Sequence, residues 1–146
     1  MDKKKLALAI AHKMSSEGNF DTDLGVKVLD ADVGYVELSM KITDIMLNSH
    51  KTCQGGVIFS FADCAFAYSC NSHNLASVAY CVDITFVNPV FSGDTLFAKA
   101  VEKNLRGKSG IYDVEIRNQN EDFIALFVGK SRTVKGFILS EDELNN

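Results

Sequence analysis

The spacing of hydrophobic positions divides this chain into helical and extended segments. Close to the N-terminus, Leu6, Ile10 and Met14 recur every four residues as far as Gly18, which places them on one face of a helix. Three lysines precede this stretch, as in a secretory signal, but only six apolar residues follow before the next polar ones, fewer than export signals use. The pattern therefore predicts a docking helix over residues 1–18.

Two segments with a period of two follow this helix. Apolar residues alternate with polar ones or glycine at Leu24, Val26 and Val28, and again from Val36 to Ile42. Such alternation predicts half-buried strands. Asp30-Ala31-Asp32 lies between the two segments and has turn chemistry, so the strands should form a hairpin.

A helix without a polar face is predicted from Val57 to Cys70. Gly55-Gly56 opens this segment and a polar run beginning at Asn71 closes it. At the helical rise the segment spans roughly 21 Å. Because it is apolar on nearly every side, it should be buried all round rather than laid on a surface.

The second half of the chain reads as four long strands with short, turn-rich links. The predicted strands cover residues 78–87, 95–103, 111–117 and 123–134. Short links of this kind imply antiparallel neighbours. The economical fold is α+β, a single domain over residues 1–146 in which a long antiparallel sheet wraps around the central helix. The last residues, 139–146, are expected to form a frayed tail.

A single carboxylate, Asp63, lies in the middle of the apolar helix. No lysine, arginine or histidine occurs between Lys51 and His73, so no local partner neutralises it. Burying an unpaired carboxylate is costly, which leads to a raised pKa or to a partner supplied by tertiary structure. Asp63 is therefore a candidate acid, base or nucleophile.

The start of the same helix is a second candidate element. Gly55-Gly56 allows close backbone approach and leaves N–H donors unpaired, which suits an anion or a developing oxyanion. The approach to it is polar, with Asn48, His50 and Gln54. Asp63 lies roughly 10 Å further along the helix, too far to act at its own helix start. A shared site would need two subunits, which predicts an obligate dimer with symmetric sites.

Composition narrows the function classes. Hydrophobic residues make up 47% and charged residues 23%, and the net charge is −4. Without a basic stretch beyond the N-terminal lysines, nucleic-acid binding is disfavoured. The four cysteines have neither zinc-finger spacing nor a C-x-x-C pair, so reduced thiols in a cytoplasmic protein fit better than a metal or disulfide framework. No segment is long enough to span a membrane.

The sequence around the helix start resembles a known family. Met46-Leu47-Asn48-x-His50-x-x-Cys53-Gln54-Gly55-Gly56 running into Phe59-Ser60-Phe61-Ala62-Asp63, together with Phe91-Ser92-Gly93-Asp94 and Gly129-Lys130-Ser131, is similar to the PaaI-type hotdog-fold thioesterases. The resemblance covers most of the chain. It implies a hotdog fold and hydrolysis of acyl-coenzyme A thioesters, with an aryl-acetyl or medium acyl group. No metal or redox cofactor is implied, and the assembly would be a homodimer or a dimer of dimers.

The resemblance also implies roles for individual residues. The Gly55 N–H would polarise the thioester carbonyl, helped by the Asn48 side chain, and Gly56 belongs to the same turn. Asp63 from the neighbouring subunit would act as general base on water or as nucleophile. Gln54 stands where the family has histidine, and it cannot carry charge or share a proton.

Two cysteines also depart from the family pattern. Cys64 replaces a common threonine, and Cys81 stands where some relatives have a serine that orients water. Cys64 has no histidine nearby to activate it, so core packing is favoured over a nucleophilic role. These departures motivate a second hypothesis, a non-catalytic acyl-thioester binding protein. A third, a hydratase or dehydratase, is disfavoured because the helix contains no histidine.

Several polar residues keep two interpretations each. His50 lines the helix entrance or is a solvated loop histidine. Lys108, Lys130 and Arg132 meet coenzyme A phosphates at a subunit edge or are ordinary strand and turn charges. Asp83, in an otherwise apolar strand, lines the site or bonds within the sheet.

Overall fold

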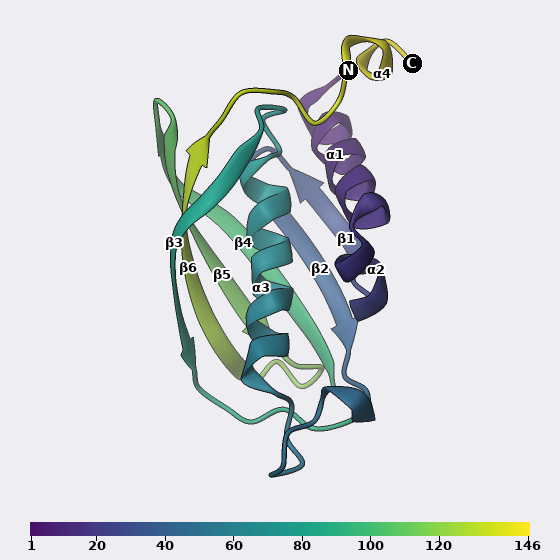
Figure 1. The fold of residues 1–146 in the computed structure, drawn as a ribbon, viewed down its shortest axis with the longest axis vertical. Helices are drawn as coiled ribbons and strands as arrows, with labels where there is room; N and C mark the ends of the chain where they lie inside the picture. Colours follow the sequence, from purple (N-terminus) through teal and green to yellow (C-terminus); the bar gives the residue numbers. More distant parts are fainter.

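The computed structural model describes residues 1–146 and contains one antiparallel sheet with a long helix lying across its face (Figure 1). The sheet has six strands in the order β1-β2-β4-β5-β6-β3. The strands are β1 (Lys27–Asp32), β2 (Tyr35–Lys41), β3 (Ser77–Phe86), β4 (Thr95–Arg106), β5 (Ser109–Arg117) and β6 (Phe123–Thr133). The predicted α+β hotdog architecture is confirmed.

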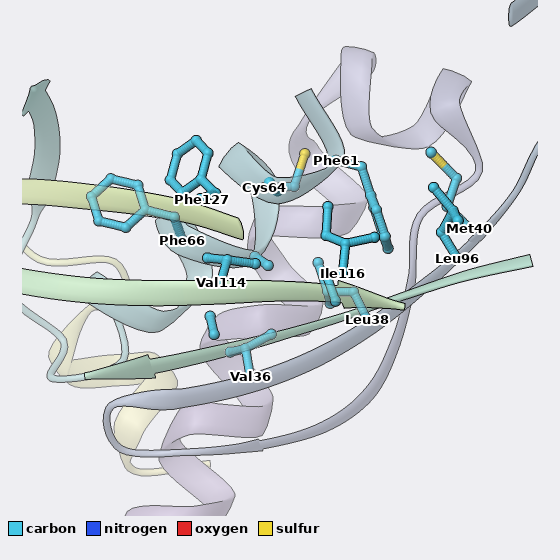
Figure 2. Packing of buried hydrophobic residues seen from close by; sticks show 14 of the residues in the cluster. Val36, Leu38, Met40, Phe61, Cys64, Phe66, Leu96, Val114, Ile116 and Phe127 are labelled. Carbon is cyan, nitrogen blue, oxygen red and sulfur yellow. The ribbon is translucent and has the colours of Figure 1, made fainter. Parts of the chain in front are cut away.

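The central helix α3 (Gly55–Cys70) packs on the concave face of the sheet. Side chains from both layers form one cluster of 27 buried residues, and Figure 2 shows Phe61 and Phe66 of α3 among strand residues of this core. Phe66 stacks edge-on against Tyr112 of β5, with ring centroids 5.6 Å apart. The helix was predicted to be buried on all sides, but in the structure it is fully buried only on the side that faces the sheet. Residues spaced along the opposite side of the helix remain partly exposed.

The N-terminal helix α1 (Lys3–Glu17) docks beside α3 and against β1. Asp2 caps its start by accepting a hydrogen bond from the Lys5 N–H at 2.9 Å, and Ala7 and Ile10 are fully buried. The docking helix predicted from the four-residue spacing is therefore confirmed, with its end at Gly18.

The first hairpin differs from the predicted one. Leu24 belongs to a short helix, α2 (Asn19–Leu24), and β1 begins only at Lys27. The turn lies at Val33 and Gly34, where Gly34 has a φ of 75°, so Asp30 is a strand residue. Its carboxylate accepts a hydrogen bond from the Lys4 ammonium at 2.7 Å, which explains an acidic residue inside the strand.

The strand β3 lies at the edge of the sheet beside β6, not beside β4. The link between β3 and β4 therefore passes under the start of α3 instead of forming a hairpin. Val90 anchors this link, since it is buried and its carbonyl accepts a hydrogen bond from the Cys53 N–H at 2.7 Å. One edge of β3 has no partner strand in the subunit, and Tyr80 and Phe86 on this strand are exposed.

The C-terminal segment is docked, whereas a frayed tail was expected from residue 139. Leu139 is buried, and its N–H donates to Asn74 Oδ1 at 2.8 Å. A capping box between Ser140 and Glu143 starts the short helix α4 (Glu141–Leu144). Glu143 then accepts a hydrogen bond from the Lys13 ammonium at 2.7 Å, so α4 is tied to α1.

Replacement of Gly129 by alanine tests the packing of α3 on β6. A Cβ at this position would lie 2.6 Å from the Phe66 ring, and Phe66 is buried, so the ring has little room to move. We expect Gly129→Ala to lower the free energy of unfolding by about 1–3 kcal/mol, measured by urea denaturation. Gly56→Ala is the matched control, because its Cβ would meet nothing within 4 Å. A wild-type urea midpoint for Gly129→Ala would contradict this packing.

The ion pair between Lys13 and Glu143 should make stability depend on pH. The lysine hydrogen bond lowers the pKa of Glu143 from its ordinary 4.5 to about 2. A lowered carboxyl pKa stabilises the fold above the unfolded value and loses that effect as pH falls toward the folded one. The stability difference between wild type and Glu143→Gln should therefore be full above pH 4.5 and fade toward acid. The exposed Glu141→Gln variant should show no such dependence; equal behaviour of both variants would contradict the pairing.

Candidate active site

Asp63 lies half-buried in the middle of α3 without a cationic partner. Its carboxylate takes part in none of the ion pairs or side-chain hydrogen bonds of the chain. Burial raises the pKa of Asp63, and the nearby carboxylate of Asp21 raises it further. The unneutralised carboxylate inferred from the sequence is thus present in the folded subunit, and its environment favours proton uptake.

Asp63 belongs to the open stripe of α3, which we define as Gly56, Ser60, Asp63 and Ala67. These residues are exposed or half-buried, and their spacing of four, three and four places them on one helix face. The Ser60 hydroxyl has its hydrogen-bond acceptor within the helix, because it donates to the Gly56 carbonyl at 2.8 Å. Along the open stripe, Asp63 is therefore the only ionisable side chain.

The start of α3 presents two N–H groups without intrahelical acceptors. Gln54 is the N-cap residue, and its carbonyl accepts from the Val57 N–H at 3.0 Å and the Ile58 N–H at 3.4 Å. The N–H groups of Gly55 and Gly56 precede these and have no carbonyl partner within the helix. The Gln54 side chain is exposed and makes no capping hydrogen bond. The helix dipole makes this turn favourable for negative charge.

A hollow of about 260 Å³ adjoins this turn and is mostly apolar. Its lining residues are Cys53, Gly55, Ile58, Phe86, Val87, Asn88, Pro89 and Val90. Phe86 is so close to Gly55 that a Cβ there would lie 3.2 Å from the ring, which gives the glycine a packing reason. The sequence analysis missed Phe86 and the 87–90 link, because only the crossing of that link under α3 brings them to the helix start.

Asn48 organises the loop that leads into α3. Its Oδ1 accepts hydrogen bonds from the His50 N–H at 2.9 Å and the Thr52 N–H at 3.2 Å, while its Nδ2 donates to the Thr52 hydroxyl at 3.0 Å. Lys51 at the loop tip has a φ of 65°. His50 is exposed beside it. One amide hydrogen of Asn48 remains outside this network, so the side chain still has a donor to offer.

The two cysteines singled out from the sequence lie in different places. Cys64 is buried within the core cluster, and burial raises the pKa of its thiol, so it stays protonated. Cys81 is exposed on β3 and pairs with Lys130 of β6. Because alternate strand residues face opposite sides and the next pair, Val82 and Gly129, faces α3, Cys81 points to the outer face. The subunit does not bring Cys81 to Asp63.

The three basic residues Lys108, Lys130 and Arg132 do cluster. Lys130 and Arg132 share the outer face of β6, and Arg132 pairs with Ser109, next to Lys108 in the β4–β5 turn. A groove of about 600 Å³ lies beside them and includes Tyr80, Arg106 and Lys130 in its lining. In one subunit Arg132 is far from Gly55, since Arg132 pairs with Val78 and β3 then extends roughly 26 Å to Phe86. Lys130 pairs with Cys81, from which β3 extends roughly 16 Å to Phe86.

No three His, Cys, Asp or Glu residues converge as a metal site. None of the helices is both long and apolar enough to cross a membrane.

The chain is similar to known proteins over most of its length. The thioesterase superfamily model matches residues 50–125, which include the helix start and Asp63. The acyl-coenzyme A thioesterase PaaI of Escherichia coli is 44% identical over 131 residues, covering 90% of this chain and 94% of that protein. The structure of the E. coli PaaI protein from the phenylacetic acid degradation operon superposes with a TM-score of 0.91 at 41% identity, covering 93% of this chain and 99% of that one.

A more distant structure shares the fold alone. It comes from Streptococcus mutans and is bound to acetyl CoA; its TM-score is 0.74 at 20% identity, covering 77% of this chain and 90% of that one. The family model and the close PaaI relative together confirm the resemblance seen in the sequence: this chain belongs to the thioesterase superfamily.

Proposed function

We propose that this protein hydrolyses acyl-coenzyme A thioesters with an aryl-acetyl or medium acyl group. One observation carries the proposal: an unpaired, half-buried carboxylate, Asp63, lies on the open stripe of a helix whose first turn offers the free N–H groups of Gly55 and Gly56. The sequence identity to an acyl-coenzyme A thioesterase supports the choice of substrate. The apolar hollow beside Gly55 suits a hydrophobic portion of such a substrate.

The proposed chemistry is acyl transfer to water. The Gly55 N–H donates to the thioester oxygen and stabilises the negative charge that develops there, with the free Asn48 amide hydrogen as a second donor. As a base, Asp63 takes a proton from water; the hydroxide adds to the carbonyl carbon, and the carbon–sulfur bond breaks to give the acid and the coenzyme A thiol. As a nucleophile, Asp63 attacks the carbonyl carbon and the carbon–sulfur bond breaks, which gives a mixed anhydride and the coenzyme A thiolate; water then cleaves the anhydride to the free acid and the Asp63 carboxylate, and the proton released goes to the thiolate. No metal or redox cofactor takes part in either route.

The site needs two subunits. Asp63 lies roughly 10 Å along α3 from Gly56, so one subunit cannot place both on one thioester group. The unpaired edge of β3 is a template for pairing with a second copy, and a two-fold axis across it would reverse the partner strand. We infer a homodimer with two symmetric sites, assembled further as a dimer of dimers.

The same symmetry gives the basic cluster a role. Lys108 and Arg132 lie at the Ser77 end of β3 and Lys130 lies beside its middle, whereas Gly55 lies at the Phe86 end. Reversal of the partner strand would bring the partner cluster toward this helix start. We infer that the cluster, with Arg106 in the adjoining groove, binds the phosphates of coenzyme A.

Gln54 favours a second candidate, a protein that binds acyl-CoA without turnover. Its exposed side chain carries no charge and has no partner in the subunit, so it orients a thioester less firmly than an imidazole would. His50 is close in the chain but is exposed in the loop.

We place the protein in the cytoplasm, because its four cysteines are free.

Removal of the Asp63 charge should abolish turnover. We expect Asp63→Asn to lower kcat at least about 100-fold with an unchanged thermal midpoint, measured by thiol release from a panel of acyl-CoAs. Glu115→Gln, an exposed carboxylate on β5, is the control and should keep wild-type rates. Most of the activity surviving in Asp63→Asn would overturn the mechanism. Tight binding without turnover, converted to turnover by Gln54→His, would favour the binding protein instead.

A charge on the β3 edge should separate the subunits. Tyr80 is exposed, so Tyr80→Lys leaves the core intact while like charges meet across the paired edges. We expect a dimer or tetramer for wild type and monomers for the variant in analytical ultracentrifugation, with activity lost in parallel. Leu29→Lys, exposed on β1 at the opposite edge of the sheet, should remain assembled and active. A fully active monomer would contradict the two-subunit site.

A further inference from the structure

The hollow beside the start of α3 has a buried apolar floor and an exposed rim. Among its lining residues, Cys53, Ile58 and Val90 are at most 5% exposed, whereas Phe86 and Val87 are about half exposed. Burial raises the pKa of the Cys53 thiol to about 11, so the thiol is uncharged at neutral pH, and the other lining side chains carry no charge. The hollow is therefore suited to an uncharged, apolar group that enters from the rim.

The backbone around the hollow is held by hydrogen bonds within the protein. The Cys53 N–H donates to the Val90 carbonyl at 2.7 Å. The N–H groups of Val87 and Asn88 both donate to one carbonyl of β6, at 2.8 Å and 3.3 Å, and the Asn88 side chain donates to the preceding carbonyl at 2.7 Å. Pro89 has no N–H to offer. Apart from the first turn of α3, these donors of the lining are thus already engaged.

An acyl-coenzyme A has two parts that could fill such a place, the acyl group and the pantetheine arm on the other side of the sulfur. The arm carries amide groups, and burial of an amide without hydrogen-bond partners costs free energy. A hydrocarbon acyl group makes no such demand. Because the donors of the lining are engaged, the hollow favours the acyl group over the arm.

Ile58 is the floor residue that shares a helix with the proposed carbonyl-binding N–H. Gly55 and Ile58 are three residues apart on α3 and both line the hollow. Residues at this spacing lie on one helix face, and side chains tilt toward the helix start, so the Ile58 side chain lies over the turn that contains Gly55. A thioester whose oxygen accepts the Gly55 N–H would therefore have its acyl carbons next to Ile58.

The volume of the hollow sets a scale for the acyl group. It is about 260 Å³, whereas an apolar cavity of about 150 Å³ is enough to hold benzene. A ring with a short linker, or a linear chain of similar size, therefore fits. A long-chain fatty acyl group exceeds this space.

We propose that the hollow is the acyl subsite of the enzyme and that Ile58, on its floor, limits the size of the acyl group. The inference rests on the proposed function, in which the Gly55 N–H stabilises the thioester oxygen. Removal of carbons from Ile58 deepens the floor and admits a longer chain, while a larger side chain excludes groups that the wild type accepts. One methylene in an apolar pocket changes kcat/KM by about tenfold or more, so the effect is measurable.

A chain-length series of acyl-CoAs tests the proposal in the assembled protein. The readout is kcat/KM for decanoyl-CoA divided by kcat/KM for hexanoyl-CoA, a ratio that does not depend on the fraction of folded enzyme. We expect Ile58→Ala to raise this ratio at least about tenfold and Ile58→Phe to lower it by a similar factor. Val57→Ala is the matched control, since Val57 adjoins Ile58 and is half-buried but lies outside the lining; it should leave the ratio unchanged.

An unchanged ratio in a folded Ile58→Ala protein would overturn the proposal. An equal change for every chain length and for free coenzyme A would also overturn it, because the hollow would then hold the pantetheine arm. If the alanine variant does not fold, Ile58→Val removes a single carbon and should still raise the ratio about fourfold.

The proposed function and the acyl subsite fail separately. Absence of hydrolysis for all acyl-CoAs would overturn the proposed function. Titration calorimetry with non-hydrolysable acyl-CoA thioethers of the same chain lengths would still decide the subsite: the preferred chain length for binding should increase in Ile58→Ala and stay unchanged in Val57→Ala.

Discussion

The structure depends on the packing of one side of α3 against a curved antiparallel sheet. Phe61 and Phe66 fill the space between the layers, and Gly129 on β6 is small enough for the Phe66 ring to lie directly on the strand. Close packing of this kind fixes the rotation of the helix about its own axis. Once that rotation is fixed, the side with Gly56, Ser60 and Asp63 faces away from the sheet. The packing of the core therefore determines which way the Asp63 carboxylate points.

The same packing explains how a charge is tolerated in an apolar helix. Asp63 does not enter the core, and only part of its side chain leaves water. Burial raises its pKa, and no ion pair with a cation lowers it again. A partly desolvated carboxylate has a greater proton affinity than a solvated one, so the open stripe has the properties that the proposed role of Asp63 as a base requires. The unpaired edge of β3 lies beside this side of the molecule, which makes the surface suited to completion by a second copy.

Much of this fold could be predicted from the sequence because its signals are local. The four-residue spacing from Leu6 to Met14 predicts α1, and the largely apolar run after Gly55-Gly56 predicts α3. The features that escaped prediction depend on contacts distant in the chain. Asp30 was predicted to lie in a turn, because its hydrogen bond with Lys4 joins residues far apart in the chain. Residues 139–146 were predicted to be frayed, because their partners, Asn74 and Lys13, lie in distant parts of the chain.

The same distinction between local patterns and distant contacts applies to the candidate site. Asp63 and Gly55 could be found from sequence, since an isolated charge in an apolar run and a glycine pair at a helix start are both local patterns. The hydrogen bond between Asp21 and Tyr68 could not, because nothing in the run Asn-Phe-Asp-Thr-Asp-Leu separates Asp21 from Asp23. The distinction arises only when Gly18 leaves space for the side chain and Tyr68 reaches it from α3. A contact between elements distant in the chain leaves no motif in either one, so its identification requires the fold that brings Asp21 and Tyr68 together.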